Sequence, residues 1–290
     1  MKLLLIGVAF DSGHRDQRMG RGPGRLIDGG AVDRLRQGGH DVEVAFAEPA
    51  SRFTTEIGTA FELQRSVAAY VGRARAANAF PLILSGNCNT AAIGALAGLG
   101  ASRPSLVWFD GHADFCTPET AEMGFLDGMG LAMATGRCWT RMTSIVPGFQ
   151  PVPDELALLV GAHDIEAREG DDLRRSGIVH VPVERLRHGV DDPALAHALA
   201  HVRTRTDATY LHIDLDVHDP SLARANHLAP DGGLTPGEVR AAVRAVATAL
   251  PVQAASLTAY DPDCDPAGRM IGVALDLMAD LVEVIAATRW

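Results

Sequence analysis

The stretch Leu106–Asp114, LVWFDGHAD, decides the fold, because a continuous apolar run passes directly into closely spaced polar side chains. A second stretch, Tyr210–Asp216 (YLHIDLD), has the same organisation. A mainly apolar run without polar alternation is typical of a strand buried on both faces of a parallel sheet. In such sheets the working site lies at the carboxyl ends of the strands. The two stretches therefore predict both the sheet and the place of a functional site.

Similar apolar runs recur along the chain, with helical patterns between them. The expected strands are Leu3–Val8, Val42–Phe46, Pro81–Leu84, Leu106–Phe109, Ala157–Val160, Ile178–Val181, Tyr210–Ile213 and Ala254–Leu257. The expected helices are Arg25–Gln37, Glu56–Asn78, Thr90–Leu99, Pro193–Thr204, Pro236–Ala249 and Leu275–Ala287. This alternation predicts an α/β fold with a parallel sheet covered on both faces. No linker-like segment divides the chain, so we expect one domain over residues 1–290.

Composition excludes several function classes. The formal net charge of −10 argues against nucleic acid or an anionic membrane as the main partner. No apolar run is long enough to span a membrane, and the N-terminus resembles a first strand rather than a signal peptide. Lys2 is the single lysine, which excludes chemistry based on a P-loop or Schiff-base lysine. The four cysteines form no C-x-x-C pair, so we expect reduced thiols and a cytoplasmic location.

Four carboxylates and one imidazole follow the two decisive strands. They belong to Asp110, His112, Asp114, Asp214 and Asp216. So many like charges at one sheet edge require cations to neutralise them, and carboxylate with imidazole suits divalent first-row metals. Helix capping by aspartate explains one such residue per strand, but not this density. The number of ligands suggests two metal ions, which would share carboxylates and activate a bridging water to hydroxide.

Two blocks of the sequence resemble the metal-binding signatures of the arginase/agmatinase (ureohydrolase) family. They are Val107–Thr120 (VWFDGHADFCTPET) and His212–Ser221 (HIDLDVHDPS). Segments similar to the same family follow its order elsewhere: GRGPGRLIDGG from Gly20, and the ranges Gly124–Ala132, Gly161–Gly170 and Gly232–Val239. The resemblance implies a three-layer α/β/α sandwich with a mainly parallel sheet of about eight strands. It also implies two Mn²⁺ ions, hydrolysis of a guanidine-type C–N bond, and a homo-oligomer, either a trimer or a hexamer.

The resemblance also implies a role for each metal-site residue. Asp110 and Asp214 would bridge both ions, while His112 and Asp216 would complete one site. Asp114 would belong to the other site and counts among the catalytic residues. The remaining family ligand, a histidine, corresponds to Cys88 in the loop Ser85–Thr90 (SGNCNT). A thiolate ligand there would favour Zn²⁺ or Fe²⁺ over Mn²⁺; alternatively, Cys88 is a small buried apolar residue and the site lacks one ligand.

Other catalytic positions also depart from the family pattern. Asp127 stands where the family has a proton-shuttling histidine, so it would relay a proton if burial raises its pKa, or else bind a cationic substrate. His218 and His227 are alternative shuttles, although a loop histidine is usually just solvated. Ala259 replaces a glutamate that contacts the guanidinium, and the following residues Tyr260 and Asp261 are its nearest substitutes.

The family's contacts to the substrate α-carboxylate are replaced by Cys116 and Met123, neither of which suits a carboxylate. Glu166 corresponds to the acidic residue that receives the α-ammonium group, although it could equally complement a helix dipole. These changes favour a modified guanidine, such as N-hydroxy-arginine, over plain arginine. The alternatives are a plain arginase or agmatinase, or a non-catalytic member that binds metal as a structural or regulatory subunit.

Overall fold

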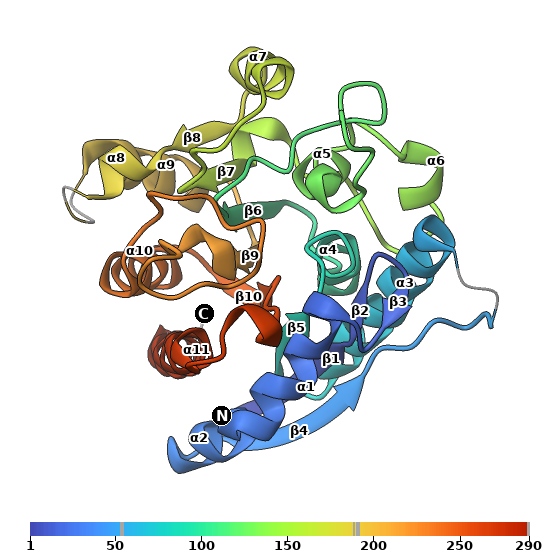
Figure 1. Cartoon of the computed structure of the whole chain (residues 1–290), viewed down its shortest axis with the longest axis vertical. Coiled ribbons are helices and arrows are strands. Elements are labelled where there is room, and N and C mark those ends of the chain that lie inside the picture. The colour runs from blue at the N-terminus through green and yellow to red at the C-terminus, as the bar shows by residue number, and fades with distance from the viewer. Residues whose placement is uncertain (53–54, 188, 190–191, 289–290) are drawn as a thin grey trace.

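A parallel sheet of eight strands forms the centre of the computed structural model, which describes residues 1–52, 55–187, 189 and 192–288 (Figure 1). Its strand order is β4-β1-β5-β10-β9-β6-β7-β8, and every neighbouring pair is parallel. The strands are β1 (Lys2–Val8), β4 (Asp41–Phe46), β5 (Phe80–Ser85), β6 (Pro104–Phe109), β7 (Ala157–Val160), β8 (Val179–Val181), β9 (Ala208–Asp214) and β10 (Val252–Thr258). All eight predicted strands are confirmed, with ends shifted by at most two residues.

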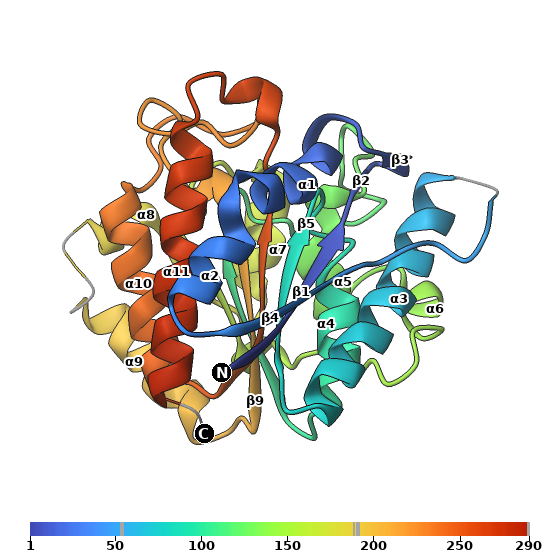
Figure 2. The same cartoon turned by 90° about the horizontal axis from the view of Figure 1, so that it is seen from below.

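Helices cover both faces of this sheet, which gives the predicted three layers (Figure 2). One face carries α2 (Val32–Gln37), α8 (Val183–Leu186), α9 (Pro193–Arg203), α10 (Pro236–Ala249) and α11 (Arg269–Thr288). The other carries α3 (Glu56–Ala76), α4 (Ala92–Leu99), α5 (Gly130–Ala134) and α6 (Thr140–Thr143). α7 (Ala167–Arg175) lies after β7.

The continuous apolar strands explain the two separate hydrophobic cores. Successive residues of a strand point to opposite faces, so Val107 and Phe109 of β6 pack into one core. Leu106 and Trp108 of the same strand pack into the other. All four are fully buried. A strand that must serve two cores cannot alternate with polar residues, which is the pattern that the sequence displays.

The first predicted helix, Arg25–Gln37, is interrupted. α1 (Gly22–Leu26) ends at a wide turn over Ile27–Ala31, and α2 follows it. Within this turn Gly30 has a φ of 105°, a conformation that glycine adopts without the steric cost paid by other residues. The predictions leave out the short hairpin β2 (Phe10–Asp11) and β3 (His14–Arg15) and the short helices α5, α6 and α8, and they give α7 only its start at Glu166.

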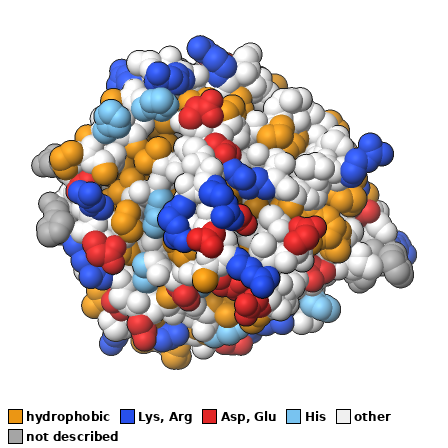
Figure 3. Space-filling model, turned by 90° about the horizontal axis from the view of Figure 1, so that it is seen from above, with side chains coloured by type: hydrophobic (Ala, Val, Ile, Leu, Met, Phe, Trp, Pro, Cys, Tyr) orange, Lys and Arg blue, Asp and Glu red, His pale blue; other side chains and the backbone are white. Residues whose placement is uncertain are grey.

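Within the described residues, no helix combines the length and the apolar character needed to cross a bilayer. Figure 3 shows one face of the molecule, on which basic and acidic side chains are interspersed with apolar ones.

Candidate metal centre and active site

Asp110 begins the loop after β6 and is fully buried. Its Oδ2 accepts a hydrogen bond from Trp108 Nε1 at 2.9 Å, and its Oδ1 accepts one from the backbone N–H of His112 at 2.7 Å. Burial, followed by the nearby Asp216, raises the pKa of Asp110 to about 6. Two hydrogen bonds therefore fix the orientation of the Asp110 carboxylate, while burial and the nearby Asp216 disfavour its negative charge.

The end of β9 meets the end of β6 through backbone donors. Asp214 Oδ1 accepts from the N–H of Asp216 at 2.7 Å, and Asp216 Oδ1 accepts from the N–H of Gly111 at 3.2 Å. Asn226 Nδ2 donates to Asp216 Oδ2 at 3.3 Å and to the carbonyl of Ala259 at 3.0 Å. The bond from Gly111 to Asp216 joins the two motifs, which the sequence separates by about a hundred residues, and the other bonds orient Asp214 and Asp216.

The imidazole of His112 lies between the carboxylates of Asp110 and Asp216. Its Nδ1 is 3.4 Å from both Asp110 Oδ1 and Asp216 Oδ2, and one ligand atom from each of these three residues lies within 4.8 Å of the others. Burial lowers the pKa of His112, but Asp216 and Asp110 outweigh it and the net shift is upward. The pKa of Asp216 is lowered against the effect of its burial, chiefly because His112 stabilises the carboxylate.

Asp114 lies in the same cluster of acidic side chains, and its backbone is in a strained conformation. Its φ is 49°, and its carbonyl accepts from the N–H groups of Leu131 and Ala132 at the start of α5. The buried carboxyl group lines the pocket. Burial, followed by the charge of Asp110, raises its pKa well above the usual range. The pKa of Asp214 is raised in the same way by burial and by Asp216.

Cys88 lies in the loop between β5 and α4 and faces the end of β9. Its Sγ donates to Asp214 Oδ2 at 2.8 Å and lies 3.0 Å from Thr258 Oγ1. The side chain is 1% exposed. Burial, followed by Asp214, raises the pKa of this thiol well above its ordinary value. The structure thus places Cys88 beside a predicted bridging carboxylate, rather than in an apolar cavity away from the site.

The two asparagines that flank Cys88 hold Asp127. Asp127 Oδ1 accepts from the backbone N–H of Asn89 at 2.8 Å and from its Nδ2 at 3.0 Å. Asp127 Oδ2 accepts from Asn87 Nδ2 at 2.7 Å. Burial nevertheless raises the pKa of Asp127 to about 7, as a proton relay requires. Sequence reasoning did not assign a role to either asparagine, although their positions around the cysteine were the available signal.

His212 is another residue at the site that sequence reasoning missed. It is fully buried in β9, and burial lowers its pKa to about 3. A ring nitrogen of His212, the Cys88 thiol and an Asp110 carboxylate oxygen all lie within 4.8 Å of one another. The signal in the sequence was a histidine at an inward position of an otherwise apolar strand.

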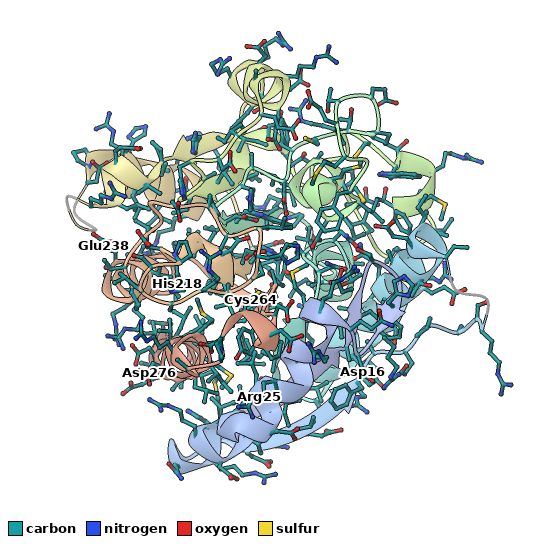
Figure 4. All side chains as sticks on the ribbon, in the orientation of Figure 1. Asp16, Arg25, His218, Glu238, Cys264 and Asp276 are labelled. Carbon is teal, nitrogen blue, oxygen red and sulfur yellow. The ribbon has the colours of Figure 1, made fainter. Side chains whose placement is uncertain are left out.

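His218 and His227, the alternative proton shuttles, do not line the pocket that contains Asp127. His218 is completely buried rather than solvated, and its Nδ1 lies 2.9 Å from the carbonyl oxygen of Leu215. Burial lowers its pKa to about 4, and it does not line the pocket. Figure 4 labels His218 among the side chains of the segment after β9. His227 is exposed and belongs to a separate group with Asp261 and Cys264.

Tyr260 and Asp261, the expected substitutes for the missing glutamate, do not reach the pocket. Tyr260 donates its hydroxyl to Asp265 Oδ2 at 3.0 Å, and Asp261 Oδ1 accepts from the backbone of Asp263. Ala259, which does line the pocket, has a φ of 63°. The chain turns at this point, so the side chains that follow Ala259 point away from the site.

The site opens into a pocket of about 260 Å³. The predicted residues on its wall are Cys88, His112, Asp114, Cys116, Met123, Asp127, Glu166, Asp214 and Asp216. Glu166 is exposed at the rim and is also the N-cap residue of α7, so both roles expected for it are compatible with its position. Phe125 and Leu228 add apolar surface, and Met123 is 74% exposed at the entrance.

The residues present fit divalent cations. Asp110, Asp114 and Asp214 all have raised pKa values, first because burial removes the carboxyl groups from water and second because neighbouring carboxylates repel their charge. Cations placed among them would remove this repulsion and stabilise the ionised forms. The oxygen and imidazole donors of Asp110, His112 and Asp216 suit Mn²⁺, whereas the Cys88 side adds a softer donor.

Arginases and an amidinohydrolase are among the known proteins whose sequences are similar to this chain. The model of the arginase family matches residues 1–283. The arginase of Bacillus caldovelox is 29% identical over 96% of this chain and 96% of its own, and its solved structure covers 97% of this chain and 98% of its own with a TM-score of 0.86. The N(omega)-hydroxy-L-arginine amidinohydrolase of Streptomyces lavendulae is 32% identical over 71% of this chain and 70% of its own. The chain belongs to the arginase family, whose members are hydrolases of C–N bonds in linear amidines.

Proposed function

We propose that this chain hydrolyses the C–N bond of a modified guanidine, such as N-hydroxy-arginine, and releases urea or a substituted urea together with an amine. The observation that carries this proposal is that His112, Asp114, Asp214 and Asp216 line one pocket, and that the buried carboxylate of Asp110 lies 3.4 Å from His112 Nδ1. We assign these five residues and Cys88 as the metal ligands. When bound, two divalent cations supply a nucleophile from water at neutral pH and stabilise the charge that develops during attack.

Asp127 is our candidate for moving the proton. Its carboxyl group lines the pocket, and its pKa of about 7 lets it both accept and donate a proton near neutrality. The amide donors of Asn87 and Asn89 fix its orientation. We propose that Asp127 delivers a proton to the leaving amine, and that Asp114 acts with it as a catalytic residue by orienting the attacking group.

The pocket wall supports a substrate with a cationic end. Glu166 is exposed at the rim, where it would bind an ammonium group of the substrate. Cys116 and Met123 give a substrate carboxylate no strong donor. Phe125 and Leu228 lie along the wall, where they would exclude water from the reacting carbon. This wall gives a substrate carboxylate little support in either case, so the preference for N-hydroxy-arginine rests on the similarity to the amidinohydrolase of Streptomyces lavendulae, and the arginases among the relatives make plain arginine the second candidate.

A competition assay tests the proposal. Arginine, N-hydroxy-arginine and agmatine are offered to the metal-loaded enzyme, and the released urea or hydroxyurea is measured. We expect the highest kcat/KM with N-hydroxy-arginine. Higher kcat/KM with arginine would establish the plain arginase instead. If none of the three releases a product, and fewer than one metal ion binds per chain, the chain is the non-catalytic member considered above.

We further propose that the active form is a cytoplasmic homo-oligomer, a trimer or a hexamer, with Mn²⁺ at the oxygen-rich side of the site. The resemblance to the family supports the assembly, and the carboxylate and imidazole donors of Asp110, His112 and Asp216 support the metal. Light scattering at several protein concentrations measures the assembly, and elemental analysis of the purified protein measures the metal.

A further inference from the structure

His212 is a buried polar side chain for which the proposed reaction provides no role. It lies in β9, two residues before Asp214, and is 0% exposed. Its ring stacks on that of Trp108, with 3.6 Å between the centroids and 17° between the planes. Trp108 in turn donates its indole N–H to Asp110 Oδ2. The imidazole is therefore held rigidly beneath the carboxylates.

The two ring nitrogens of His212 have different hydrogen-bond partners. Nδ1 lies 3.0 Å from the hydroxyl oxygens of both Tyr210 and Ser256. Nε2 lies 3.4 Å from Thr258 Oγ1, and that same hydroxyl lies 3.0 Å from Cys88 Sγ. A proton on Nδ1, donated to either hydroxyl oxygen, leaves the lone pair on Nε2, the nitrogen that shares the Thr258 hydroxyl with Cys88. Metal-binding histidines are commonly oriented by such a bond on their other nitrogen.

The surroundings provide the remaining ligands. One ligand atom each from His212, Cys88 and Asp110 lies within 4.8 Å of the other two, and all three side chains are buried. Asp214 Oδ2 is 2.8 Å from Cys88 Sγ. A thiol, an imidazole and carboxylates around one point are the donor types of zinc and ferrous iron sites.

We propose that His212 is a metal ligand, and that it supplies from β9 the imidazole that is missing from the β5–α4 loop. Cys88 Sγ, His212 Nε2 and the Asp110 carboxylate then hold one ion, beside the site formed by His112 and Asp216. On binding, the sulfur–metal bond forms and the thiol proton leaves to solvent. Thr258 is placed to donate its hydroxyl hydrogen to the thiolate. Because the donors are softer, this site takes Zn²⁺ or Fe²⁺ in preference to Mn²⁺.

This inference rests on the proposed function only in requiring bound metal, so it can be tested without any assay of hydrolysis. X-ray absorption spectroscopy of the zinc-loaded protein counts the sulfur and imidazole ligands per ion. For two ions we expect one sulfur, from Cys88, and two imidazoles, from His112 and His212. His212→Asn keeps a polar group near the place of Nδ1 and removes Nε2. We expect it to show one imidazole fewer and to bind one of the two ions more than about 100-fold more weakly, since even loss of an orienting partner costs 10–100-fold.

Ser256→Ala is the matched control, because Ser256 touches only the Nδ1 side of His212. We expect the imidazole count to stay at two and the affinity to fall by no more than about 100-fold. A wild-type spectrum with one imidazole for two ions would overturn the proposal, whether or not His212→Asn folds. An unchanged imidazole count in a folded His212→Asn would overturn it too. Two imidazoles in a protein that hydrolyses no guanidine would support the ligand and overturn only the proposed reaction.

Discussion

The two sides of the pocket differ in how closely they follow the family pattern. On one side, Asp110, His112 and Asp216 keep the residues of the arginase signatures and present oxygen and imidazole donors. On the other, a ligand atom of His212 in β9 lies within 4.8 Å of the Cys88 thiol, at the position that the sequence comparison predicts to be a histidine in the family. Asp110 belongs to both groups. The two proposed ion sites would therefore differ in donor chemistry while sharing the carboxylate of Asp110.

The largest expected effect comes from the residue that the two sides share. Asp110→Asn weakens a ligand of both proposed ions, so we expect kcat/KM to fall by more than about 100-fold and metal content to fall on both sides. Elemental analysis and urea release measure these effects. Asp231→Asn, in an exposed loop, is the control and should leave both values unchanged. Loss of metal from one side alone would show that Asp110 is not shared.

Asp127→Asn separates proton transfer from metal binding. The amide has no group that ionises near neutral pH and cannot act as a general acid, so we expect kcat to fall by about 10²–10⁴-fold while both ions remain bound. The pKa of Asp127 is about 7 in the protein, and the proposed reaction needs its protonated form. The wild-type rate should therefore fall as the pH rises through about 7, and this pH dependence should be absent from the variant. An unchanged pH profile would assign proton transfer to another group.

Replacing Cys88 tests whether metal binding on the side of Cys88 and His212 depends on the sulfur. Cys88→Ala should lose one ion and keep the other, which His112 and Asp216 hold. Cys88→His should shift the preference of the altered side from Zn²⁺ toward Mn²⁺ and raise Mn²⁺ occupancy, because imidazole is a harder donor than thiolate. Competition between Mn²⁺ and Zn²⁺, followed by elemental analysis, measures the change. Identical occupancy by both Zn²⁺ and Mn²⁺ in Cys88→Ala and the parent would exclude Cys88 as a ligand.

The stability of the metal-free protein should depend on pH in a specific direction. Folding raises the pKa of Asp110 to about 6 and that of Asp127 to about 7, from 3.8. The folded state therefore binds more protons than the unfolded state, and the stabilisation present below pH 3.8 is lost as pH rises through about 6 to 7. We expect a loss on the order of a few kcal/mol. Thermal melting across this range measures it, and added Zn²⁺ should suppress the part that comes from Asp110. A melting temperature that rises between pH 4 and 7 without metal would contradict this assignment.

The smallest effect is expected at the rim, away from both metal ions. Glu166 is exposed, so an ion pair with a substrate ammonium is worth about 0.2–1 kcal/mol, which corresponds to at most about a fivefold rise in KM. Glu166→Gln should show this rise with kcat unchanged. Equal kinetics for substrates with and without the ammonium group in the parent enzyme would assign Glu166 to capping of α7 alone.

The sequence by itself determined the sheet, because each strand buried on both faces must be continuously apolar, and it placed Asp110, His112, Asp114, Asp214 and Asp216 at the ends of two strands. These are local consequences of strand periodicity.

Only the tertiary structure decided which distant side chains meet. Three contacts depend on the order in which β5, β10, β9 and β6 lie side by side. They are the hydrogen bonds from Asn87 and Asn89 to Asp127, the burial of His218, and the stacking of His212 on Trp108. Spacing along a chain does not encode that order, because it arises from packing of the whole sheet.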